Sequence, residues 1–306
     1  MVKILDYHAE DLGSNPTPDK LAKLSLWCTV STVLSDDGLP HYITEKSFDT
    51  ALRECAQYFL VSDETIAGYY RQGFPETDEV KQLIRCTVLN LDAYDDSTGP
   101  LEYVLGNYFK PCPSDTEYAE RTRCCVKTAL DNICPSDVYS RSYASFMCYY
   151  REYGNLVTED QFVPNTLYEL TQMMLFVQST LNLPYEVLVQ FSKGNVVNDP
   201  NFPTVLYVWA VRGGYYSLGE GIQLDRLYTQ YGVPGLISTE TQKCVADVAQ
   251  ANCNADDLTI MYNTFLTCLR PLLPFENLLQ TFAVEQLKCI KPCAGGAPAA
   301  HVGYRY

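Results

Sequence analysis

The sequence predicts an all-α protein built from two tandem, disulfide-bonded helical domains. Three observations lead to this: many cysteines, a repeat in their spacing, and apolar residues at helical rather than strand intervals. A chain of 306 residues has room for two domains of ordinary size, each with its own core. We expect a first domain at 1–157 and a second at 158–306, with a loose, Gly- and Pro-rich tail from about residue 294.

The thirteen cysteines indicate disulfides rather than metal sites. They form no paired C-x-x-C knuckles, and the chain has only three histidines, so we expect no metal and no cofactor. Because the number is odd, at least one thiol stays free or pairs between chains. Self-association through an intermolecular disulfide is therefore an open expectation.

The cysteine spacing recurs along the chain. In each of two groups, eight residues separate the first two cysteines, and thirteen or fourteen residues precede the third. The groups are Cys125, Cys134 and Cys148, and then Cys244, Cys253 and Cys268. A proline five residues before a Thr-Glu pair stands ahead of both, at Pro111 and Pro234. This pattern predicts a duplication, with a seam between Gly154 and Asn165.

The earlier parts of the two copies align more weakly. Cys55 falls opposite Ser179, and Cys86 falls opposite Ala210. The alignment implies that the second copy has lost one bridge.

Helical periodicity and start signals place most of the chain in helices. Ser47 and Ser62 precede acidic first turns, as helix N-caps do. The predicted helices cover residues 49–59, 78–91, 118–132, 140–153, 167–180, 186–192, 203–211, 223–231, 239–252, 258–269 and 276–290, and a further helix starts at residue 62.

Composition and motifs exclude several classes of function. A net charge of −15 argues against nucleic acid and anionic membranes as partners. No apolar run is long enough to span a bilayer, so we expect no membrane span. The start of the chain lacks a signal-peptide core, so a secreted form would have lost its leader. No G-x-S-x-G, H-E-x-x-H or P-loop motif occurs, and we expect no enzyme.

Residues 45–155 carry a known pattern. Thirty residues separate Cys55 from Cys86, an Asp-x-x-Gly sequence follows at Asp96–Gly99, and Cys125 and Cys148 come at the expected intervals. The chain thereby resembles the insect odorant-binding protein family (pheromone and general odorant-binding proteins), as an atypical two-domain member distantly like the salivary D7 proteins. The resemblance implies two tandem odorant-binding-protein-like helical domains.

The resemblance also implies a disulfide framework. It pairs Cys55 with Cys86, Cys125 with Cys148, and Cys244 with Cys268. The places of the family's second and fifth cysteines hold Gln82 and Tyr139, so one bridge is missing as a unit. Some cysteines are left over for substitute bridges, namely Cys28, Cys112, Cys124 and Cys134. Cys253 is expected to reach Cys289 or Cys293.

Ligand binding is the activity that the resemblance implies. A helical cage would hold a small hydrophobic molecule such as a lipid, terpenoid or odorant-like compound. The same residues would equally pack as an ordinary core, because both uses need apolar side chains at helical spacing. The expected lining residues are Phe59, Ile66, Tyr70, Phe74, Leu83, Val88, Tyr108, Phe146 and Tyr150 in the first copy, and Phe176, Phe191, Tyr207, Tyr228 and Phe265 in the second.

The prediction for function is a secreted, non-enzymatic carrier or scavenger of small hydrophobic ligands. An alternative is a structural protein of eggshell or cuticle, cross-linked through some of its 24 tyrosines. A third is a scavenger of amines, which would require an acidic residue in the pocket.

Overall fold

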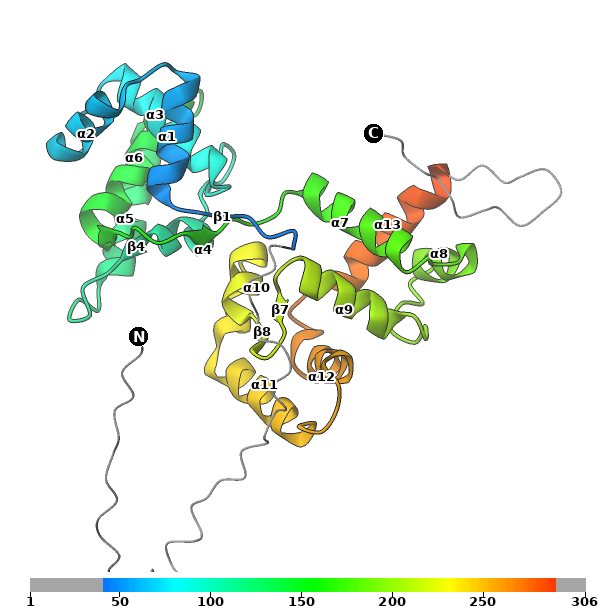
Figure 1. Cartoon of the computed structure of the whole chain (residues 1–306). Coiled ribbons are helices and arrows are strands. Elements are labelled where there is room, and N and C mark those ends of the chain that lie inside the picture. The colour runs from blue at the N-terminus through cyan, green and yellow to red at the C-terminus, as the bar shows by residue number, and fades with distance from the viewer. Residues whose placement is uncertain (1–40, 290–306) are drawn as a thin grey trace, which may run out of the picture.

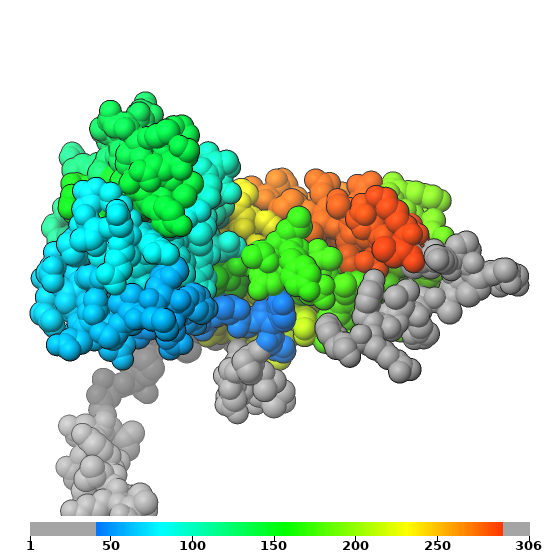
Figure 2. Space-filling model, turned by 90° about the horizontal axis from the view of Figure 1, so that it is seen from above, coloured from blue at the N-terminus to red at the C-terminus, as the bar shows by residue number. Residues whose placement is uncertain are grey.

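The computed structural model describes residues 41–289, and this part of the chain is mainly helical, which confirms the predicted all-α class. The helices form two groups that follow one another along the chain (Figure 1). The space-filling view shows them as two lobes side by side (Figure 2). The predicted helices agree closely with the observed ones, and the predicted tail lies outside the described residues.

The first group contains six α-helices, a short hairpin, one 3-10 turn and one π-helical turn. In chain order they are α1 (Phe48–Tyr58), α2 (Asp63–Gln72), α3 (Asp78–Asn90), the hairpin β2 (Tyr94–Asp95) and β3 (Gly99–Pro100), α4 (Glu102–Leu105), the 3-10 turn η2 (Gly106–Tyr108), α5 (Tyr118–Asn132), α6 (Val138–Cys148) and the π-helical turn η3 (Tyr149–Tyr153).

The second group repeats this order and adds one helix. It consists of α7 (Leu167–Thr180), α8 (Tyr185–Ser192), α9 (Phe202–Arg212), the hairpin β7 (Tyr216–Ser217) and β8 (Gly221–Ile222), α10 (Leu224–Tyr231), the 3-10 turn η4 (Pro234–Ile237), α11 (Thr239–Ala251), α12 (Asp257–Thr264), the π-helical turn η5 (Phe265–Leu269) and α13 (Phe275–Cys289).

Local sequence explains where these helices begin and end. The Ser47 hydroxyl accepts a hydrogen bond from the Thr50 backbone N–H at 3.1 Å, which caps α1. Thr166 and Glu169 form a reciprocal capping box at the start of α7. Gly73 ends α2 in the left-handed conformation, with φ of 67°, which a glycine adopts at little cost.

Each group has its own hydrophobic core. Phe48, Phe74 and Phe146 are fully buried in the first, and Trp209 and Phe275 are fully buried in the second. The change from one core to the other falls between neighbouring residues, because Phe162 belongs to the second core and Val163 to the first.

The two groups share a backbone register. Leu60, just after α1, has φ of 57°, and Asn182, just after α7, has φ of 47°. The backbone hydrogen bonds around them match, from Val61 N–H to the Ala56 carbonyl and from Leu183 N–H to the Gln178 carbonyl. Leu60 and Asn182 are 122 residues apart in the sequence. The hairpin turns after α3 and α9 are separated by the same number of residues, and so are Asn107 and Thr229.

This register corrects the sequence alignment of the missing bridge. At the shared separation, Cys55 corresponds to Val177 and Cys86 to Val208, whereas the sequence alignment pointed to Ser179 and Ala210. The error is two residues in both helices. Val177 is fully buried, so an apolar side chain packs where the first group has a disulfide.

The two groups contact each other through corresponding elements. The Asn107 side chain after α4 donates to the Thr229 hydroxyl in α10 at 2.9 Å. The Tyr103 ring meets the Tyr228 ring edge-on at 6.1 Å between centroids. Because the same helix of each group supplies the contact, the arrangement resembles the interface of a two-fold symmetric dimer.

The segments that lead into each group are exchanged. The strand β1 (Glu45–Lys46) pairs antiparallel with β6 (Gln161–Phe162). Tyr42 and Ile43, ahead of the first group, pack against the second core. Val163, ahead of the second group, packs in the first core. A further pair, β4 (Phe109–Lys110) with β5 (Asn155–Leu156), closes the first group.

Three disulfides join the pairs that the resemblance implied. Cys55–Cys86 links α1 to α3, Cys125–Cys148 links α5 to α6, and Cys244–Cys268 links α11 to η5. The last two occupy corresponding places in the two groups. Cys253 is disulfide-bonded as well.

The substitute bridges proposed for Cys112, Cys124 and Cys134 are not formed, because all three are free and exposed. Cys124 and Cys125 are neighbours on α5 and project about 100° apart around the helix axis, so only Cys125 faces Cys148. Cys289 is also free, so it is not the partner of Cys253. The pairing of Cys28 and Cys293 lies outside the described residues.

Candidate functional site

A groove crosses the first domain between the turn that joins α2 to α3 and the helices α5 and α6. Its volume is about 750 Å³, a size typical of small-molecule sites. The lining residues are Gln72, Gly73, Phe74, Pro75 and Glu76 from the turn, Cys125, Ala129, Asn132, Ile133 and Cys134 from α5 and its end, and Asp137, Ser140, Tyr143, Ala144, Met147, Cys148, Arg151 and Glu152 from α6 and beyond.

The floor of the groove is apolar and fixed in place. Phe74, Tyr143 and Met147 are all buried. The Tyr143 hydroxyl donates to the backbone carbonyl of Phe74 at 2.7 Å, which ties α6 to the turn. The Cys125–Cys148 disulfide joins the two helical walls. The groove is therefore largely preformed.

An aromatic cluster backs the floor. The Phe74 ring lies edge-on to Phe146 at 5.2 Å and to Tyr150 at 5.4 Å between centroids. Tyr70 meets it from α2 at 5.0 Å. Burial raises the pKa of the Tyr70 hydroxyl, which donates to Asp49 at 3.1 Å, so Tyr70 stays neutral at physiological pH.

Charged residues form the rim. Glu76, Asp137 and Glu152 are acidic and Arg151 is basic. Glu76 pairs with Lys81 at 2.9 Å and Glu152 with Arg121 at 3.5 Å, which leaves Asp137 as the rim carboxylate outside an ion pair. Hydrogen bonds from the backbone and hydroxyl of Ser140 lower the pKa of Asp137, which caps α6. Carboxylates at the mouth disfavour a ligand that carries its own negative charge.

The predicted lining residues of the first domain divide into three sets. Phe74 borders the groove, and Tyr70 and Tyr150 are half-buried behind it. Phe59 is 38 % exposed, because α1 ends there and its ring lies outside the core. The remaining residues are fully buried and pack as core, namely Ile66, Leu83, Val88, Tyr108 and Phe146.

In the second domain none of the predicted lining residues borders the pocket described below. Phe191 and Phe265 are buried core residues, and Tyr207 and Tyr228 pack half-buried against that core. Phe176 is 40 % exposed, and the Arg212 guanidinium lies 3.5 Å above its ring. Its role is therefore a surface cation–π contact rather than a cavity wall.

The pocket of the second domain lies at the corresponding place, along the Cys244–Cys268 disulfide between α11 and α12. Its volume is about 590 Å³. The corresponding disulfide cysteine, Cys125 or Cys244, lines each groove. Sequence reasoning missed Tyr143, Ala144 and Met147, although Ala144, four residues before Cys148, shares the bridged side of α6.

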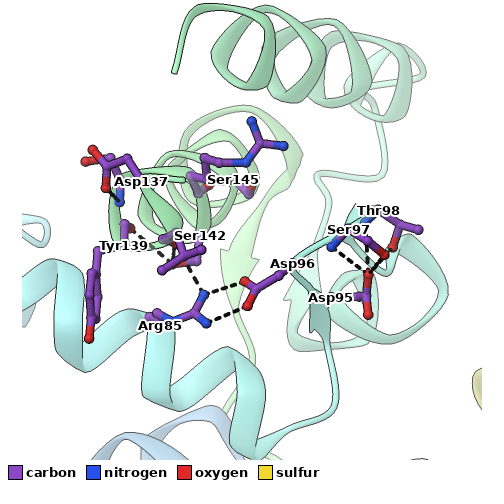
Figure 3. Close-up of polar contacts among 12 residues, drawn as sticks. Arg85, Asp95, Asp96, Ser97, Thr98, Asp137, Tyr139, Ser142 and Ser145 are labelled. Carbon is purple, nitrogen blue, oxygen red and sulfur yellow. Dashed lines mark hydrogen bonds and ion pairs between the residues drawn. The ribbon is translucent and has the colours of Figure 1, made fainter. Parts of the chain in front are cut away.

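A cluster around Arg85 connects α3 to the β2–β3 hairpin and to the start of α6 (Figure 3). The Arg85 guanidinium in α3 donates to both oxygens of Asp96, at 2.6 and 2.7 Å, and to the Val138 carbonyl of α6 at 3.4 Å. It also lies 5.6 Å from the ring centroid of Tyr139. Hydrogen bonding to Arg85 holds the pKa of Asp96 below its usual value. Polar contacts thus join α3 to α6.

Within residues 41–289, no three or more His, Cys, Asp and Glu side chains gather as a metal site would require. In the same range, no helix combines the length and hydropathy of a membrane span.

Comparison with known proteins places these features in a family. Residues 42–152 match the PBP/GOBP family. Over 160 residues, the chain is 32% identical to general odorant-binding protein 69 of Anopheles gambiae, an alignment that covers 49% of this chain and 69% of that protein. The crystal structure of Anopheles gambiae odorant-binding protein 22a aligns at 27% identity and a TM-score of 0.27, covering 34% of this chain and 96% of that one. The chain is therefore a member of the PBP/GOBP family.

Proposed function

We propose that this protein binds small hydrophobic ligands without chemical turnover, as a carrier or scavenger, and that the groove of the first domain is its ligand site. Membership of the PBP/GOBP family supports small-ligand binding in general. The observation that carries the proposal is the preformed apolar floor of Phe74, Tyr143 and Met147 beneath a polar rim. Such a site gains affinity from apolar burial and orientation from a few polar groups.

The groove favours one class of ligand over others. Its floor suits an aliphatic or cyclic apolar body, whereas the carboxylate of Asp137, which is outside an ion pair, repels an anionic head. A neutral alcohol or a terpenoid fits both features. We therefore expect fatty alcohols to bind more tightly than fatty acids of the same chain length.

Secretion and a tandem origin complete the proposal. Stable disulfides are typical of oxidising, extracellular surroundings. The shared element order, register and disulfide position support two copies of one domain, with boundaries at 1–157 and 158–306. The comparisons give no support to the structural-matrix role, and it is not part of the proposal.

Displacement of N-phenylnaphthylamine, a fluorescent apolar probe, tests the ligand site. Ala129 lines the groove, so Ala129→Trp should fill it and weaken probe binding at least tenfold. Thr128→Trp places the same ring on the exposed side of α5 and serves as the matched control. Equal binding by both variants would overturn the assignment of the groove, and no binding by the unmodified chain would overturn the function.

A further inference from the structure

One free thiol borders the groove of the first domain. Among the free cysteines within residues 41–289, Cys134 alone lines this groove, just after the end of α5. Its counterpart in the second domain, Cys253, is disulfide-bonded and offers no thiol. The first groove therefore carries a nucleophile beside its apolar floor, whereas the second domain has none at the corresponding position.

The local backbone exposes and activates this thiol. Cys134 begins a tight turn in which the Asp137 N–H donates to the Cys134 carbonyl at 2.9 Å. The turn brings the Ser136 hydroxyl to 3.1 Å from the Cys134 sulfur. Hydrogen bonding from Ser136 lowers the pKa of the Cys134 thiol and outweighs the opposing charge of Asp137. A larger share of Cys134 is therefore thiolate, the form that reacts with electrophiles.

The same turn occurs a second time, away from the groove. Residues 112–115 repeat the sequence Cys-Pro-Ser-Asp of residues 134–137. The Ser114 hydroxyl again lies 3.1 Å from the Cys112 sulfur and lowers the pKa of that thiol. Cys112 is also free and exposed, but it does not line the groove. A difference between the two thiols in their reactivity toward an apolar molecule should therefore come from the groove.

We propose that the groove of the first domain captures apolar α,β-unsaturated carbonyl compounds by a covalent bond to the Cys134 sulfur. The inference rests on the proposed ligand-binding function and specifies a ligand class for the same site. The buried floor of Phe74, Tyr143 and Met147 points to an apolar ligand independently of the thiol, and it holds the hydrocarbon chain. These compounds are neutral, so the carboxylate of Asp137 does not repel them.

The reaction is a conjugate addition, which needs no oxidant and no reductant. The Cys134 thiolate attacks the β-carbon of the unsaturated carbonyl, and a C–S bond forms as the C=C π bond breaks. The electron pair moves to the carbonyl oxygen as an enolate, and the α-carbon then takes a proton from water. The proton that the thiol released restores the water, so atoms and charge balance. Binding in the groove holds the electrophile beside the sulfur and thereby raises the rate.

Competition between Cys134 and Cys112 tests the proposal in the full chain with its disulfides formed. Pentyl vinyl ketone and methyl vinyl ketone react through the same group, and only the first carries an apolar chain. Arg121, Arg123 and Lys127 place the two cysteines in different tryptic peptides, so mass spectrometry follows both adducts in one sample. We expect the ratio of the Cys134 rate to the Cys112 rate to be at least fivefold higher for pentyl vinyl ketone than for methyl vinyl ketone. A smaller difference would overturn the proposal.

Two tryptophan variants show whether the groove causes the preference. Ala129→Trp fills the groove and should abolish the preference of pentyl vinyl ketone for Cys134. Thr128→Trp carries the same ring on the exposed side of α5 and should keep it. A preference that is lost in both variants, or kept in both, would overturn the proposal.

Binding of N-phenylnaphthylamine separates this proposal from the ligand-binding function on which it rests. The probe carries no electrophilic group, so its binding reports the groove without the thiol reaction. A chain that binds the probe but shows no preference for Cys134 overturns covalent capture and leaves the proposed function standing. A chain that does not bind the probe overturns the proposed function, and covalent capture with it.

Discussion

The first and third helices of each domain are connected by side chains at corresponding positions, but the two domains use different interactions there. In the first domain, Glu54 accepts hydrogen bonds from Lys46 and Asn90, each at 2.6 Å. At the separation of 122 residues that relates α1 and α3 to α7 and α9, Glu54 corresponds to Phe176 and Asn90 to Arg212, which form the cation–π stack. Both arrangements tie the first helix of the domain to the third. The backbone register is thus kept while the side chains that secure it change.

The covalent tie differs in the same way. Cys55–Cys86 joins α1 to α3, whereas Val177 and Val208 pack at the corresponding positions of α7 and α9. A disulfide stabilises mainly by restricting the unfolded chain, and buried valines stabilise by removing apolar surface from water. Removing the bridge should therefore destabilise the first domain, and adding a bridge should stabilise the second.

The largest effect is expected for Cys55→Ala combined with Cys86→Ala. Loss of a bridge that closes a loop of 31 residues should cost the first domain about 3–4 kcal/mol. Urea unfolding followed by circular dichroism measures this cost. In a Trp27→Phe background, Trp209 fluorescence reports the second domain, and its transition should stay where it was. A shift of both transitions by the same amount would show that the domains unfold as one unit.

The converse change is Val177→Cys with Val208→Cys. Because these positions match Cys55 and Cys86, we expect a disulfide to form and to stabilise the second domain by about 2–3 kcal/mol. Thiol titration and urea unfolding provide the measurements. Ser179→Cys with Ala210→Cys is the matched control, and these two cysteines should stay reduced. Bridging of the control pair instead would disprove the register.

A smaller loss is expected for Arg85→Ala. Arg85 joins Asp96 and the end of α6 across a partly exposed surface, so its removal should cost about 1 kcal/mol. Because hydrogen bonding to Arg85 lowers the folded pKa of Asp96, this stabilisation is present above pH 3.8 and is lost as the pH falls through the lowered pKa. Unfolding measured between pH 3 and pH 6 should show less acid dependence in Asp96→Asn than in the unmodified chain.

The smallest effect concerns Leu60, which is 93 % exposed and left-handed, while its counterpart is Asn182. Asparagine tolerates this conformation better than leucine. Leu60→Asn should therefore raise the free energy of unfolding by about 0.5–1 kcal/mol. The reverse change, Asn182→Leu, should lower the free energy of unfolding by a similar amount. Free energies of unfolding that are equal in the two variants would contradict the account.

Much of the fold could be predicted because its signals are local. N-cap serines and apolar residues at helical intervals predicted the helices, and the family resemblance implied the pairs of Cys55, Cys125 and Cys244. The bridge positions of the second domain were misplaced by two residues, since no cysteine marks them and α7 is longer than α1. Only the turn geometry after each helix reveals the correspondence.

The candidate site was harder to predict. Leu83 and Phe146 have the same sequence pattern as a cavity wall, yet they are core, because periodicity indicates the buried face of a helix and not what lies against it. Phe59 and Phe176 are exposed for reasons that involve distant partners or a helix end. The groove itself depends on how the turn at Phe74 meets α6, a long-range contact that no local pattern encodes.

The central claim, that the groove of the first domain is the ligand site, can be measured directly by N-phenylnaphthylamine binding to the full chain. We predict a saturable site that is lost in Ala129→Trp and kept in Val248→Trp, which changes the second groove instead. Binding that survives Ala129→Trp and disappears in Val248→Trp would contradict the account.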